Sequence, residues 1–133
     1  MIKTKRVQVN KVKSRDYQMV AENFIHGANL AKEFEYWNAA GVLIVHAAIA
    51  YADAITIKVA GLKSRGEDHL SVVRLLEEIV HLDETGKKAI HNLRRIIEEK
   101  SLVSYSGEIY SRPDIERLWK ILLRFRDWAV GLL

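Results

Sequence analysis

Two polar side chains interrupt an otherwise apolar stretch of the sequence, His46 and Asp53. They are seven residues apart, so on a helix they lie two turns from each other on nearly the same face. An imidazole and a carboxylate at that spacing could form a polar site beneath a cleft. They could also belong to a buried network with a helix cap, an arginine or Tyr17, because an unpaired buried carboxylate costs several kcal/mol. We expect the buried network.

The other histidines do not extend this pair into a metal site. The five histidines fall on four expected helices, and no acid and histidine occupy adjacent turns as ligands would; they are His26, His46, His69, His81 and His91. The chain has no cysteine, which excludes thiolate ligands, cysteine nucleophiles and disulfides. Glycine-rich phosphate loops and a serine elbow are also missing from the sequence. We therefore expect no metal and no cofactor.

Basic residues gather in two parts of the chain. Residues 1–15 contain six lysines and arginines and no acid, whereas the remainder has 15 basic and 17 acidic residues. On the last expected helix, Arg117, Lys120 and Arg124 line one side. Together with Lys100 and the arm they could form a surface for nucleotide or RNA, whose phosphates attract such clusters in a salt-dependent way. A solvated helix face is the alternative interpretation.

Length and composition indicate one packed domain. The chain has 133 residues, of which 49% are apolar, enough for a single core and too few residues for two. We assign residues 1–13 to a basic N-terminal arm, extended or mobile, and residues 14–133 to the folded domain. No apolar run follows the basic N-terminus, so we expect no signal peptide and a cytoplasmic protein.

The stretch from Asn38 to Gly61 is predicted to be the central helix. It is rich in alanine, and its larger apolar side chains point in all directions around a helix axis, which is typical of a helix buried on every side. Asn38 is a candidate N-cap and Gly61 a candidate terminator. A membrane span of this length would contain His46, Asp53 and Lys58, which hydrocarbon penalises, so we expect no membrane association.

Four amphipathic helices are expected to surround the central one. The first begins at Ser14 as N-cap and ends near Tyr36, and the third begins around Asp68 after a polar loop over residues 62–67. The fourth follows a turn at residues 83–86, with Thr85 as its cap, and closes in a turn at residues 104–110. The last begins at Ser111, where Pro113 and Asp114 suit a first turn. The predicted fold class is all-α, an up-and-down helical bundle of about five helices.

Read in this order, the chain resembles the HEPN domains, a broad group of small helical bundles. Three segments carry the resemblance: VHAAIAYADA (Val45 to Ala54), DHLSVVRLLEE (Asp68 to Glu78) after a short basic loop, and a helix ending in EEKSLVSY (Glu98 to Tyr105). The resemblance covers roughly Ala39 to Trp128. It implies a HEPN-like helical bundle, and in many members of the family a dimer.

The resemblance also implies a function. HEPN domains act as partners of small nucleotidyltransferases in toxin–antitoxin-like pairs, and the active branch consists of metal-independent ribonucleases with arginine and histidine at a dimer cleft. Lys100 and Tyr105 stand where the active branch has those two residues. Lysine lacks the bidentate fork of arginine, and tyrosine is a poor base at neutral pH. The first hypothesis is therefore a binding module for nucleotide or RNA, with Lys100, Tyr105, Arg117, Lys120 and Arg124 as binding residues.

Two alternatives remain beside the binding module. One is an endoribonuclease of the active branch, in which Lys100 and Tyr105 would be catalytic. The other is a structural or scaffolding dimer without ligand. All three include a homodimer, because the last helix has a broad apolar stripe and the sequence closes on the apolar residues Leu132 and Leu133. A small nucleotidyltransferase is the partner protein that the family resemblance implies.

Overall fold

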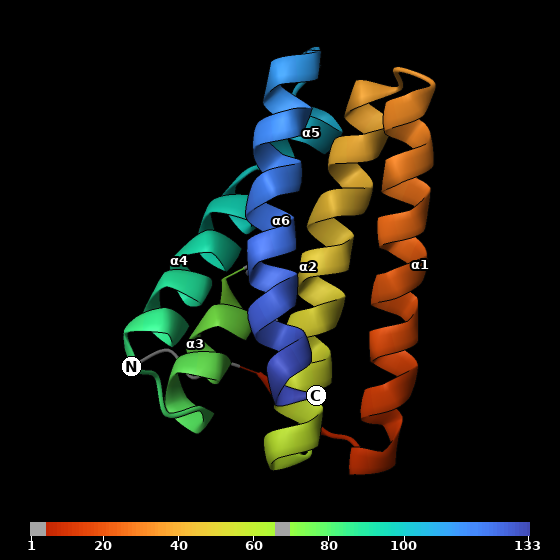
Figure 1. Ribbon diagram of the computed structural model, residues 1–133. Coiled ribbons are helices and arrows are strands. Elements are labelled where there is room, and N and C mark those ends of the chain that lie inside the picture. The colour runs from red at the N-terminus through yellow and green to blue at the C-terminus, as the bar shows by residue number, and fades with distance from the viewer. Residues whose placement is uncertain (1–4, 66–69) are drawn as a thin grey trace.

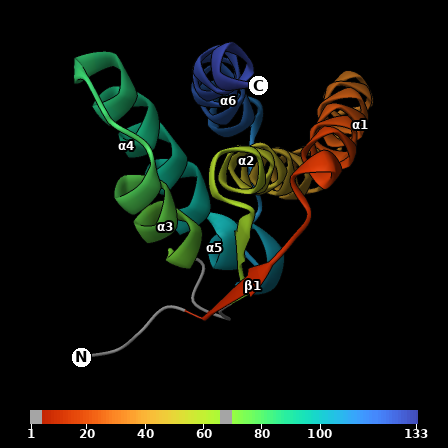
Figure 2. The ribbon, with the colours of Figure 1, turned by 90° about the horizontal axis from the view of Figure 1, so that it is seen from below.

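Helix α2, Trp37–Ala60, runs through the middle of the fold. In the computed structural model, which describes residues 5–65 and 70–133, α2 contacts every other helix, and the view along its axis shows them arranged around it (Figure 2). Fourteen of its 24 residues are buried. By length and composition α2 would also fit a membrane span, but 78% of its most apolar window is buried under the rest of the chain, as in a core helix.

The predicted all-α bundle of about five helices is confirmed (Figure 1). Around α2 lie five further helices in the described residues: α1 (Ser14–Glu33), α3 (Ser71–Ile79), α4 (Glu84–Glu98), α5 (Lys100–Tyr105) and α6 (Arg112–Leu132). Helix α5 has only six residues and follows α4 almost directly, where one continuous helix was expected. The predicted start of the third helix, around Asp68, falls outside the described residues.

Three predicted helix caps have other roles in the structure. Ser14 is already inside α1, and its hydroxyl donates a hydrogen bond to the carbonyl of Ala54 (2.7 Å). Asn38 lies in the first turn of α2 and does not cap it, because its side chain binds backbone groups of a later segment. Asp83, rather than Thr85, caps α4 by accepting a hydrogen bond from the backbone N–H of Gly86 (2.8 Å). Short polar side chains serve as caps or tertiary clamps equally well, and sequence does not separate the two.

Helix α1 ends three residues earlier than predicted. It stops at Glu33, and Glu35 adopts a left-handed conformation with φ of 61°. The backbone N–H groups of Glu35 and Tyr36 bind the carbonyls of Lys32 and Ala31, so the last turn of α1 is closed by a Schellman-type motif without glycine. The chain then turns back into α2 at Trp37, which places α1 and α2 antiparallel.

The described part of the basic arm is fixed against the bundle. Strand β1 (Arg6–Gln8) pairs antiparallel with strand β2 (Leu62–Ser64), and a 3₁₀ turn, η1 (Lys11–Lys13), leads into α1. The expectation of a loop over residues 62–67 is therefore wrong for its first three residues. Three-residue strands give too short an alternation for a sequence pattern to reveal.

Gly61 terminates α2 as predicted, and it does so in the left-handed conformation with φ of 65°. An added Cβ would meet the carbonyl oxygen of Val9 at 3.3 Å. We expect Gly61→Ala to lower the free energy of unfolding by about 1–2 kcal/mol, because a left-handed alanine is strained by that amount. Urea denaturation measures the effect. The matched control is Gly131→Ala in α6, where a Cβ meets nothing within 4 Å and stability should not fall.

Helix α6 begins as the sequence predicts. Ser111 and Asp114 form a capping box, and Pro113 lies in the first turn. The apolar stripe of α6 packs on α2 and α4, and its buried members are Ile115, Leu118, Ile121, Leu122, Phe125 and Ala129. The breadth of this stripe is thus accounted for within one chain. The stripe therefore gives no reason to expect a second copy on α6, and the homodimer stays a prediction.

Candidate functional site

The structure does not join His46 and Asp53 into one polar site. His46 is half-buried, and its ring lies against Phe24 with the ring centroids 5.8 Å apart. Burial lowers the pKa of His46, and the positive charge of Lys100 lowers it further. No hydrogen bond links His46 to Asp53 among the contacts of the described residues. The lowered pKa favours the neutral imidazole, whose ring packs against Phe24 of α1.

Asp53 is buried without the network that the sequence predicts. Only 7% of the residue is exposed, and its carboxylate makes no hydrogen bond or ion pair to the residues that the structure describes. Burial raises the pKa of Asp53 to about 7, against a smaller opposing effect from the charge of Lys63 on β2. The carboxyl group can therefore be held neutral near pH 7. That suits a core position.

A partly buried network does join the helices, but it is built on Tyr51. Arg126 of α6 donates from Nε to the hydroxyl of Tyr51 (3.0 Å), and its Nη2 lies 3.3 Å from Oε2 of Glu22 on α1. Tyr51 itself has no exposed surface, and burial together with Glu22 raises the pKa of its hydroxyl. The network ties α1, α2 and α6 together, and we assign it a structural role.

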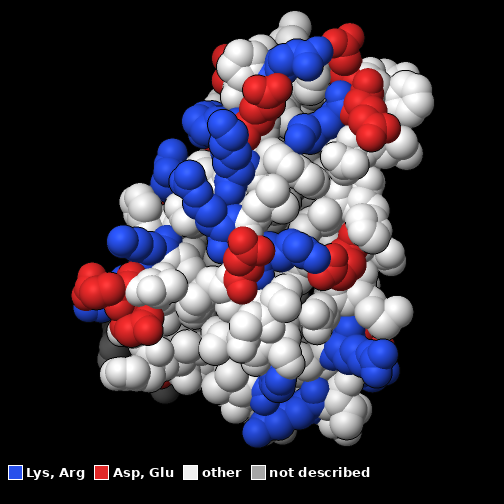
Figure 3. Space-filling view, in the orientation of Figure 1, with Lys and Arg blue, Asp and Glu red and all other residues white. Residues whose placement is uncertain are grey.

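A groove with basic walls lies between α4 and α6. It encloses about 320 Å³, and its lining residues are Arg95, Pro113, Glu116, Arg117, Lys120, Ile121 and Arg124. Figure 3 shows lysine and arginine side chains forming a band along α6 and the adjoining side of α4. We call this feature the α4–α6 groove. It contains three of the predicted binding residues, Arg117, Lys120 and Arg124.

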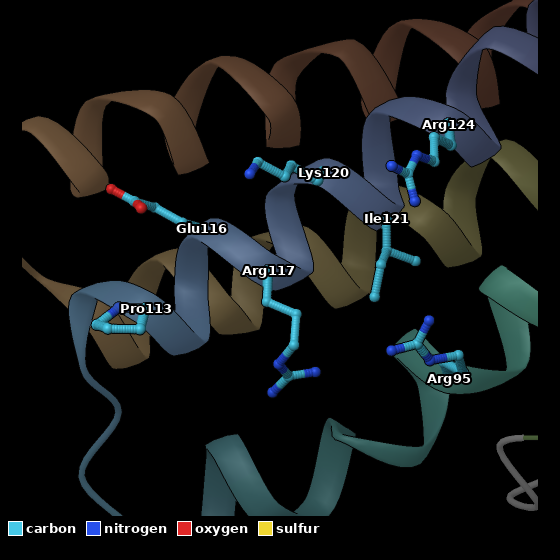
Figure 4. A pocket seen from close by; sticks show the side chains of 7 residues that line it. All are labelled: Arg95, Pro113, Glu116, Arg117, Lys120, Ile121 and Arg124. Atoms are coloured by element: carbon cyan, nitrogen blue, oxygen red, sulfur yellow. The ribbon is translucent and has the colours of Figure 1, made fainter.

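The fourth cation of the groove, Arg95, was not singled out from the sequence. In Figure 4 the side chain of Arg95 reaches from α4 toward Ile121 and Arg124 across the groove, whereas Glu116 points away from Arg95. Its neighbour Arg94 pairs instead with Glu77 of α3 (3.3 Å). The amphipathic pattern of α4 marks both arginines as outward, and only the packing of α4 against α6 separates their roles. The sequence around an arginine does not reveal whether its side chain faces another helix across a groove.

Three of the groove cations have no acidic partner in the described structure. Other arginines pair with acids: Arg6 with Glu78, Arg112 with Glu35, and Arg126 with Glu22. Arg95, Lys120 and Arg124 form no such pair among the described residues, and Glu116 is the one acid in the lining. Concentrated positive charge with little internal compensation attracts anions.

Arg117 is held in place at one end of the groove. Its Nη2 donates to Oε1 of Glu99 (3.0 Å), and the hydroxyl of the buried Tyr110 donates to Oε2 of the same carboxylate (2.6 Å). Burial raises the pKa of Tyr110 first, and its hydrogen bond to Glu99 raises it further. The guanidinium is therefore oriented by Glu99, and part of its charge is neutralised.

Lys100 and Tyr105 lie outside the groove. Lys100 begins α5, and its charge acts on His46. Tyr105 ends α5 and is 82% exposed. The structure therefore separates the five predicted binding residues into a group of three in the groove and two residues on α5. Within residues 5–65 and 70–133, no three histidine or acidic side chains come together as metal ligands would.

The fold and the groove define the class of protein: an all-α helical bundle with a basic groove between two of its outer helices. Comparisons with protein-family models, with curated proteins and with solved structures found no match.

Proposed function

We propose that this chain is a HEPN-type binding module that binds the phosphates of nucleotide or RNA in the α4–α6 groove. The observation that carries the proposal is the meeting of Arg95, Lys120 and Arg124 from two helices without acidic partners among the described residues. Arg117, positioned by Glu99, adds a fourth donor. The resemblance of the sequence to HEPN domains supports the same class of ligand.

The charged side chains of the groove are exposed, so they can be changed without disturbing the core. We expect the double charge reversal Arg95→Glu/Arg124→Glu to weaken binding of a labelled single-stranded RNA by at least about tenfold at 100 mM salt, because lost phosphate contacts act additively through counterion release. Fluorescence anisotropy measures the dissociation constant.

The matched control is Lys13→Glu/Lys87→Glu, which changes the net charge equally. Both lysines are exposed, lie outside the groove and sit beside an acid, Asp16 and Glu84 respectively. The control should leave the dissociation constant within about twofold. Equal weakening by both double variants would show that only net charge matters, and the groove assignment would then be wrong.

The ribonuclease alternative is tested in the same preparation. The structure leaves Tyr105 open to solvent and Lys100 on the same short helix. Cleavage of RNA that persists in EDTA and disappears in Lys100→Ala would support that alternative over the binding module. We expect no cleavage, because a tyrosine hydroxyl is a poor general base at neutral pH.

The homodimer and a nucleotidyltransferase partner remain proposals that rest on the resemblance. Large exposed apolar side chains gather at the end of the bundle where α1 turns into α2 and α5 leads to α6: Phe34, Tyr36, Tyr105 and Ile109. The rings of Phe34 and Tyr36 stack there with centroids 6.3 Å apart. This end, rather than α6, is the surface on which a second copy or a partner would bury apolar area. Light scattering at micromolar concentration, with Phe34→Ser as the variant, tests the dimer.

A further inference from the structure

The α4–α6 groove differs in construction from sites that hold the phosphates of a single nucleotide. Such sites commonly use backbone N–H groups of a glycine-rich loop or a helix N-terminus. Here the start of α6 is occupied by its own capping box of Ser111 and Asp114. Every polar side chain that lines the groove is charged, so a ligand would be held chiefly by side-chain charge.

The cations are spread along the groove and do not converge on one point. Arg117, Lys120 and Arg124 follow each other at intervals of three and four residues on α6, which corresponds to roughly 10 Å from first to last at the rise of an α-helix. Arg95 faces this row from α4 (Figure 4). A row of this kind fits successive phosphates of a chain better than the clustered phosphates of one nucleotide.

The lining offers no aromatic ring on which a base could stack. Sequence-specific recognition of single-stranded RNA uses aromatic stacking and hydrogen bonds to base edges. The described lining contains no aromatic ring and no amide or hydroxyl side chain, and its uncharged members are Pro113 and Ile121. An arginine can bind or stack on a base, but cations that follow one another along a helix suit phosphates, so the bases of a bound strand would add little to affinity.

From these features we infer that the groove binds the sugar–phosphate backbone of a single RNA strand across three or four consecutive phosphates, without base specificity. The inference rests on the proposed function and narrows its ligand from nucleotide or RNA to an RNA strand. Because single strands release about 0.7 counterion per neutralised phosphate, the slope of log K against log salt should be about −2 to −3.

The test compares labelled twelve-residue oligo-U and oligo-A with unlabelled ATP as competitor, by anisotropy over a range of salt. We expect the two homopolymers to bind within about threefold of each other, ATP to bind at least about tenfold more weakly, and Lys120→Ala and Arg124→Ala each to reduce the slope by about 0.7. The control Lys87→Ala should leave the slope unchanged.

The possible failures are distinguishable. ATP that binds as tightly as the oligonucleotides, or a preference of more than about thirtyfold between the homopolymers, would overturn the backbone inference and leave the proposed function standing. Binding with a slope near zero would also overturn it, because charge would then not be the source of affinity. No binding of any of the three ligands would overturn the proposed function as well.

Discussion

The free energy of unfolding of Asp53→Asn, taken relative to that of the unchanged protein, is expected to rise by about 4 kcal/mol between pH 4 and pH 8. Burial raises the pKa of Asp53 to about 7, whereas an unfolded chain titrates it near 4. Over the interval between these values the folded state keeps a proton that the unfolded state has lost. The unchanged protein is therefore destabilised as the pH rises from 4 to 7, and asparagine, which does not titrate, removes the effect.

Urea denaturation at pH 4, 6 and 8 measures this difference. A pH-independent cost of placing an amide in the core cancels when the two pH values are compared. The control is Asp127→Asn, which removes an exposed carboxylate from α6 and should show no such trend. A difference between Asp53→Asn and the unchanged protein that is constant with pH would mean that Asp53 titrates in the folded state as it does in the unfolded chain.

Replacing Asn38 by alanine is expected to lower the free energy of unfolding by about 2–4 kcal/mol, since three hydrogen bonds of about 1 kcal/mol each are lost and a partly buried partner left unpaired costs more. Asn38 makes one hydrogen bond to α5 and two to the segment that joins α5 to α6. Its Nδ2 donates to the carbonyls of Val103 (3.1 Å) and Glu108 (2.8 Å), and its Oδ1 accepts from the backbone N–H of Tyr110 (2.9 Å).

The effect of Asn38→Ala should reach the groove. Tyr110 orients Glu99, which in turn orients Arg117, so loosening the segment at Tyr110 frees the guanidinium. Thermal and urea unfolding measure stability, and amide hydrogen exchange of residues 106–110 reports the loosening. Asn29→Ala is the control: Asn29 is exposed on α1, and alanine is the better helix former, so stability should be equal or higher. An unchanged midpoint in Asn38→Ala would show that water replaces all three bonds.

Much of the fold could be predicted because the helices of this chain are strongly patterned. The alanine-rich stretch identified α2, and proline and acid after Ser111 identified the start of α6. Elements of three to six residues could not be predicted, because β1, β2 and α5 are too short to show a period and owe their conformation to contacts with α2 and with each other. The break between α4 and α5 belongs to this group.

The candidate site was predictable only in part. Arg117, Lys120 and Arg124 share one helix, so their common side follows from helical spacing. Arg95 joins them from another helix. The acids that neutralise Arg94 and Arg112 lie in other helices or turns, so the sequence near each arginine does not show the pairing. Asp53 shows the reverse case: its burial was predicted, but the network expected around it formed on Tyr51.

By itself the sequence determined which segments are helical, which helix is buried on all sides, and that positive charge collects on α6, because these properties depend on residue type and local spacing. Only the tertiary structure decided how α4 and α6 meet to make a groove, and which arginines are neutralised by acids. It also decided how closely α5 approaches α2. A Cβ added at Gly41 of α2 would lie only 2.6 Å from a methyl carbon of Val103 on α5. These features depend on pairs of residues distant in sequence, whose distances are set by the packing of the whole bundle.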